Sequence, residues 1–149
     1  MTRADVLGGL GPGEREVVLR TAREVTYDDG ARLFDEGGRA DRCWLIRHGR
    51  VALDTTIPGQ GRVVLQTLGP GDLLGWSWLV PPYRWHFGAC AVGTVQATEL
   101  DAEQLRALAD RDPRVGYALA RQLLVIMLDR LQATRARLLD LYRSPADGR

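Results

Sequence analysis

The sequence has only two cysteines, no lysine, no asparagine and no long hydrophobic run. Cys43 and Cys90 are too few for a disulfide framework, and neither lies in a metal-ligand spacing, so we expect no metal site and no cofactor. The N-terminus lacks the apolar core of a signal peptide, and no stretch approaches the roughly 18 apolar residues of a membrane span. These absences predict a soluble, cytoplasmic protein with no membrane partner.

An excess of basic charge is also missing. All 20 basic residues are arginine and 19 residues are acidic, which leaves a net charge of +1. A nucleic-acid-binding domain normally carries a basic excess or a basic stripe, so we expect no DNA binding by this chain. With 149 residues, of which 45% are hydrophobic, the chain has the length and composition of one globular domain.

The spacing of apolar residues divides the chain into a helical start and a longer β region. Residues 13–24 follow Gly11-Pro12 and have the pattern of a short amphipathic helix. From residue 25 to residue 100, short apolar runs alternate with glycine-rich turn signals such as His48-Gly49. This pattern predicts seven or eight short strands in an antiparallel β-roll or jelly roll, a mainly β fold with flanking helices.

After residue 100 the period becomes helical again. Asp101 is placed to cap a short helix over residues 101–111. Asp112 and Pro113 give a strong start signal for a long helix over residues 112–143, because proline is favoured at the first helical position. Residues 144–149, which include Pro145, are expected to form a frayed tail.

The long helix carries a seam of residues spaced alternately by three and four, which is the spacing of a heptad repeat. The seam consists of Tyr117, Ala120, Leu124, Met127, Leu131, Thr134, Leu138 and Leu141. A second apolar stripe, Leu119, Leu123 and Ile126, runs only along the first half. We therefore expect the helix to pack on the roll by its first half and to form a two-fold homodimer along the seam. The alternative is a core stripe within one chain.

Regularly spaced glycine, acidic and apolar positions give the chain a resemblance to a known family. The positions are Gly30, Phe34, Glu36, Gly37, Ala40, Asp41, Leu45, Ile46, Gly49 and Val51, then Leu68-Gly69-Pro70-Gly71-Asp72-Leu73-Leu74-Gly75. They resemble the cyclic nucleotide-binding domain family, above all the effector domains of bacterial catabolite-activator and fumarate-nitrate-type (Crp/Fnr) regulators. The resemblance covers roughly residues 14–143 and implies a β-roll with a long C-terminal dimerisation helix.

The resemblance also implies a ligand site, and this sequence departs from it at two positions. In the family a glutamate after the last glycine of the turn accepts the ribose hydroxyl, and an arginine about ten residues later pairs with the cyclic phosphate. Here Trp76 follows Gly75, and the arginine position falls on Trp85, one residue after Arg84. Two indoles remove the polar anchors and add flat apolar surfaces with one N–H donor each.

Three interpretations of this altered site stay open. The candidate ligand-binding residues are Gly75, Trp76, Ser77, Trp78, Arg84 and Trp85. In the first, these residues, together with Phe87, line a pocket for a flatter and less polar small molecule than a cyclic nucleotide. In the second, the tryptophans fill the cavity and leave a ligand-free dimeric scaffold. In the third, cAMP or cGMP binds through Arg84 and the backbone of Gly75–Ser77.

Other function classes find little support in the residues. Haem would need an axial ligand, for which only His48 and His86 are available, and an iron–sulfur site would need clustered cysteines. Ser77 and His86 are the only nucleophile and base candidates, and no catalytic motif surrounds either, so an enzyme is not expected. The family's transcription factors continue into a helix-turn-helix domain, which this sequence does not contain. We expect a stand-alone regulatory domain acting through a protein partner.

Overall fold

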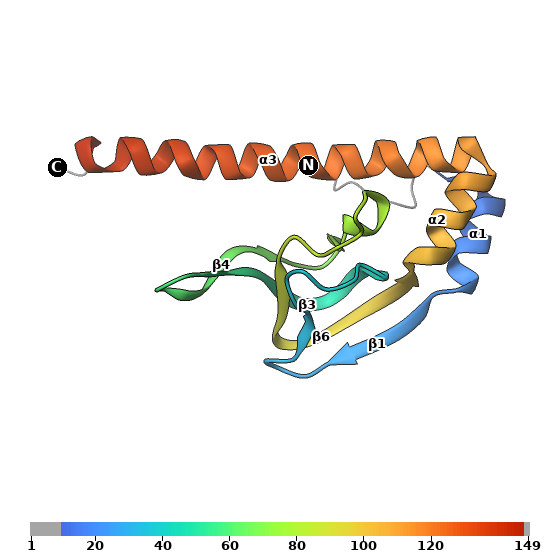
Figure 1. Cartoon of the computed structure of the whole chain (residues 1–149), viewed down its shortest axis with the longest axis horizontal. Helices are drawn as coiled ribbons and strands as arrows, with labels where there is room; N and C mark the ends of the chain where they lie inside the picture. Colours follow the sequence, from blue (N-terminus) through green and yellow to red (C-terminus); the bar gives the residue numbers. More distant parts are fainter. Residues whose placement is uncertain (1–9, 148–149) are drawn as a thin grey trace.

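The computed structural model describes residues 10–147 of the chain and, within that range, six strands and three helices. The elements in chain order are α1 (Pro12–Arg20), β1 (Arg23–Tyr27), β2 (Arg32–Phe34), β3 (Arg42–Ile57), β4 (Gly61–Leu68), β5 (Leu73–Leu74), the 3-10 turn η1 (Ser77–Leu79), β6 (Gly88–Asp101), α2 (Ala102–Arg111) and α3 (Pro113–Asp147). In Figure 1 the helix α3 lies along one side of the sheet, with α1 and α2 at one end.

The strands form one antiparallel sheet in the order β1-β6-β3-β4, with β2 paired to β6 and β5 paired to β3. The two long strands β3 and β6 pair from Arg42 opposite Asp101 to Asp54 opposite Gly88. They bend together, so the sheet curls into a roll with the long helix beside it (Figure 1). The predicted fold class, an antiparallel roll with a long C-terminal helix, is confirmed.

The expected number of strands is wrong, because two pairs of short runs are continuous strands. The signal His48-Gly49 lies inside β3, where the pairing with β6 shifts register on both sides of His48. Gly49 has φ +88°, and a Cβ there would lie inside contact distance of the Thr94 carbonyl oxygen and 3.0 Å from the Val95 Cα. The glycine therefore forms a β-bulge, which bends the strand without ending it.

Two predicted helix boundaries also need correction. The first helix ends at Arg20 instead of residue 24, because Arg23–Tyr27 pairs with β6 and this sheet pairing outweighs the helical pattern. The helix α3 continues to Asp147, through part of the expected tail, and residues 148–149 lie outside the described range. Pro145 is tolerated because the turn before it is exposed to water, which can solvate the carbonyl left without a donor.

The helix α3 has a buried half and an exposed half. Leu119, Leu123 and Ile126 are buried and belong to the same hydrophobic core as the strands, as the second apolar stripe predicted. Residues 131–143 are exposed, and this end of the helix extends past the tip of β4 (Figure 1). Within residues 10–147, every helix is too short or too polar to cross a lipid bilayer.

We expect Gly49→Ala to destabilise the protein by about 3 kcal/mol, because the substitution combines positive φ with a backbone clash. Gly59→Ala is the matched control: Gly59 has φ +82° but nothing within 4 Å of an added Cβ. Its loss should be about 1 kcal/mol. Urea unfolding of both variants measures the difference, and equal losses would show that the bulge does not need close backbone approach.

Candidate functional site

The turn between β5 and β6 presents the candidate ligand-binding residues. The Gly69 N–H donates to Asp72 Oδ2 over 2.8 Å, and Gly71 takes φ +89°, which fixes the turn that leads into β5. Gly75 follows with φ +93°, and the single turn η1 begins directly afterwards, with Trp76 at its N-cap position. The chain reversal around Gly75 thus sends consecutive side chains in different directions.

Trp85 and Trp78 belong to the core of the roll. The Trp85 indole is 5% exposed and stacks on Phe34, with ring centroids 3.9 Å apart and planes inclined by 17°. A Cβ added at Gly75 would lie 3.0 Å from two carbons of this indole. Trp78 is fully buried, and its Nε1 donates to the Gly75 carbonyl over 3.2 Å. Both side chains therefore pack beneath the turn.

Trp76, in contrast, is half-buried and points to the surface of the roll. Its ring stacks on exposed His86, with centroids 4.8 Å apart, and meets Phe87 edge to face at 6.2 Å. Ser77 is buried, and its Oγ forms a 2.9 Å hydrogen bond with His86 Nδ1. The imidazole is thus held by the Ser77 hydroxyl on one side and by the Trp76 ring on the other.

Arg84 belongs neither to the buried core beneath the turn nor to the surface around Trp76. It is exposed, and its Nη1 donates to the Gly37 carbonyl over 3.4 Å. The structure thus separates the six candidates: Trp76 faces an open groove, Gly75, Ser77, Trp78 and Trp85 are buried, and Arg84 faces solvent.

The open groove has a volume of about 590 Å³ and lies between β4 and the second half of α3. Trp76, Phe87 and Leu53 contribute from the roll. The remaining lining residues are Val63, Val64, Leu65 and Gln66 of β4, and Met127, Arg130, Leu131, Thr134, Arg137, Leu138 and Leu141 of α3. The lining is mostly apolar, contains two arginines and includes no acidic side chain.

Arg130 and Arg137 join α3 to the roll, and the sequence reasoning missed both. Arg130 donates to the Leu73 carbonyl, and Arg137 Nη1 donates to the Leu65 carbonyl over 2.6 Å. Burial lowers the pKa of Arg130 from its ordinary value, and the nearby Asp72 carboxylate opposes this shift. The spacing in the sequence could have identified them, because the apolar stripe of residues 119, 123 and 126 continues at helical spacing to both arginines.

Most of the residues in the predicted dimer seam are open to solvent in the single chain. Tyr117, Leu124, Leu131, Leu138 and Leu141 are all more than half exposed. Ala120 and Met127 are half-buried, and Thr134 is exposed. Leu128 and Tyr142, which the seam did not include, extend the exposed apolar surface. This surface lies on a different side of α3 from the buried stripe.

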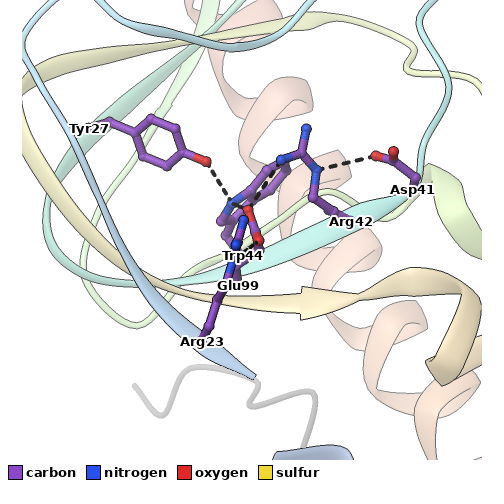
Figure 2. Close-up of polar contacts among 6 residues, drawn as sticks. All are labelled: Arg23, Tyr27, Asp41, Arg42, Trp44 and Glu99. Atoms are coloured by element: carbon purple, nitrogen blue, oxygen red, sulfur yellow. Dashed lines mark hydrogen bonds and ion pairs between the residues drawn. The ribbon is translucent and has the colours of Figure 1, made fainter. Parts of the chain in front are cut away.

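Apart from the groove, a cluster of polar side chains surrounds Glu99, as Figure 2 shows. Its carboxylate is nearly buried and accepts hydrogen bonds from Arg23 (2.8 Å), Arg42 (3.3 Å) and the Trp44 indole (3.2 Å). The same indole N–H donates to the Tyr27 hydroxyl over 3.2 Å. These charges line a hollow of about 450 Å³. The cluster orients Trp44, which stacks on Phe34 in the core, and that structural role accounts for its geometry.

The chain thus combines an antiparallel roll, a glycine turn followed by a single 3-10 turn, and a long C-terminal helix. Residues 24–112 match the sequence profile of the cyclic nucleotide-binding domain. The chain belongs to the cyclic nucleotide-binding domain family, which confirms the resemblance.

Several similar proteins are bacterial regulators. The chain is 28% identical over 150 residues to the CRP-like cAMP-activated global transcriptional regulator of Mycobacterium tuberculosis, covering 100% of this chain and 65% of that protein. The crystal structure of Thermus thermophilus catabolite activator protein superposes with a TM-score of 0.69 at 28% identity, covering 92% and 62% of the two chains. A cyclic nucleotide-binding domain from Methylobacillus flagellatus shares the fold at 20% identity, with a TM-score of 0.76 over 87% and 73%. The chain spans less than two thirds of the curated relatives it matches.

Because Trp85 is a core residue and Trp76 lines the open groove, their replacement by alanine should lower the free energy of unfolding by different amounts. We expect Trp85→Ala to destabilise the protein by about 3–5 kcal/mol, because it leaves a cavity under Gly75. Trp76→Ala should cost about 1 kcal/mol, since its ring is half solvated. Chemical denaturation of both variants measures this, and a Trp76→Ala loss as large as that of Trp85→Ala would contradict the assignment.

Proposed function

We propose that this chain is a dimeric, non-catalytic ligand-sensing domain whose cyclic-nucleotide site has been rebuilt for a less polar small molecule. In this proposal the cassette that binds nucleotide in the family is degenerate, and the domain signals through a protein partner. The regulators among its relatives support a regulatory role.

One observation carries the proposal: the Trp85 indole lies against Gly75 and Phe34. The family resemblance gives this position to the arginine that pairs with the cyclic phosphate. Here the position supplies an apolar ring that occupies the space beside the glycine backbone. Trp76 stands at the glutamate position and offers no acceptor for a ribose hydroxyl.

The groove beside Trp76 favours the interpretation as a ligand-binding domain over the interpretation as a ligand-free scaffold. Its volume of about 590 Å³ lies within the usual range for small-molecule sites, roughly 300–1,000 Å³. Arg84, which the cyclic-nucleotide alternative requires, does not line this groove. The space available therefore lies toward α3, and the part of the site beneath Gly75 is filled.

We expect cAMP and cGMP to bind with dissociation constants weaker than about 1 mM. Two charge-assisted hydrogen bonds of ~1.5–3 kcal/mol each are absent, which corresponds to about two to four decades in affinity. Isothermal titration calorimetry with both nucleotides measures this. A micromolar constant that Arg84→Ala abolishes, and that Arg50→Ala at another exposed arginine leaves intact, would establish nucleotide binding and overturn the proposal.

The dimer rests on the exposed seam of α3. We expect the wild type to sediment as a dimer at micromolar concentration, and Leu124→Asp with Leu131→Asp to give a folded monomer, because the carboxylates would be desolvated in the seam. Ala136→Asp is the control, since Ala136 is exposed on the same helix outside the seam. A monomeric wild type in sedimentation velocity would refute this part of the proposal.

A further inference from the structure

The groove between β4 and α3 is apolar along most of its lining but carries positive charge on its helical side. We propose that it binds an organic anion with a flat, apolar body, whose acidic group is held by Arg137. This inference rests on the proposed function, because it names the chemical class of the ligand for the same site.

The roll side of the groove suits a flat apolar body. Trp76 and Phe87 meet edge to face, with their planes inclined by 69°, and Leu53 lies in the same wall. Aromatic side chains bind planar rings by stacking and edge contacts, and they bury a large apolar area. None of these three side chains offers a hydrogen-bond acceptor for sugar hydroxyls or purine amino groups, and Gln66 of β4 supplies the one side-chain amide in the lining. The roll side thus favours hydrocarbon or aromatic surface over a nucleoside.

The helical side suits an acidic group. Arg137 uses one of its N–H donors on the Leu65 carbonyl, and a guanidinium has five donors in a planar fork that fits a carboxylate, phosphate or sulfonate. Thr134 lies three residues earlier on the same helix and lines the same groove. A hydroxyl and a guanidinium at this spacing can contact one anionic group together.

The charge of the lining favours an anion over a neutral occupant. Arg130 and Arg137 both line the groove, and none of the lining residues is acidic. Arg130 lies about two helical turns before Arg137, roughly 10 Å along the axis. A neutral ligand would desolvate the Arg137 guanidinium without supplying a counter-charge, which is costly, whereas Arg130 is already buried with the Asp72 carboxylate nearby. An anionic ligand removes that cost.

A matched pair of fluorescent probes tests the inference. The anion 1-anilinonaphthalene-8-sulfonate and the neutral N-phenyl-1-naphthylamine share a ring system and differ by the sulfonate. We expect the anion to bind the native protein with one site per chain and about tenfold more tightly than the neutral probe. Fluorescence titration in buffer that keeps the protein folded measures both constants.

Single substitutions test whether Arg137 is the residue that holds the acidic group. Arg137→Gln should weaken binding of the anion about tenfold and leave the neutral probe unchanged, whereas Arg137→Lys should weaken it less, because lysine keeps the charge but lacks the planar fork. Trp76→Ala should weaken both probes, because it removes the apolar wall. Arg50→Gln, at an exposed arginine on β3 that does not line the groove, should change neither constant.

The inference is overturned if the two probes bind equally, or if Arg137→Gln leaves the affinity for the anion unchanged. Either result would leave the proposed function standing, because a rebuilt site could then hold a neutral ligand. Failure of the proposed function gives a different result: micromolar cAMP binding that depends on Arg84 and is independent of Arg137.

Discussion

The packing of the Trp85 indole between Gly75 and Phe34 is the contact on which the site depends. Gly75 makes the contact possible, since a side chain at that position would collide with the ring and its φ of +93° suits glycine. The Trp85 indole belongs to an aromatic cluster with Phe34 and Trp44. The Trp44 N–H donates hydrogen bonds to Glu99 and Tyr27. In the proposed function, this filled core leaves no room for a charged ligand beneath the turn, and the groove beside Trp76 is the accessible part of the site.

The long helix connects this surface to the proposed dimer. One side of α3 packs on the roll through an apolar stripe that ends in Arg130 and Arg137, which hold the roll by its carbonyl groups. Another side presents the apolar seam. Leu131, Leu138 and Leu141 belong both to the seam and to the groove, so the two proposed sites share side chains. Binding in the groove and association of two helices are therefore expected to influence each other's free energy.

The sequence predicted the fold well, because glycine spacing and heptad periodicity are local signals. It misjudged Gly49, since a glycine that bends a strand and one that ends it look alike without the neighbouring strand. It also kept Trp76, Trp78 and Trp85 together in each interpretation, in which they either line a pocket or fill it. Which way each ring points depends on the turn at Gly75, a tertiary feature that composition does not contain. Arg130 and Arg137 were missed because arginines on a long helix are usually solvated.

The four tryptophan indole N–H signals in a ¹H–¹⁵N correlation spectrum, assigned by single Trp→Phe variants, report directly which of the four rings a ligand contacts. On titration with 1-anilinonaphthalene-8-sulfonate we expect the Trp76 signal to shift, while the signals of Trp44, Trp78 and Trp85 stay in place. Titration with cAMP should move none of them. A saturable shift of the Trp85 signal on addition of cAMP would show that the space beside Gly75 still receives a nucleotide, and would contradict the account.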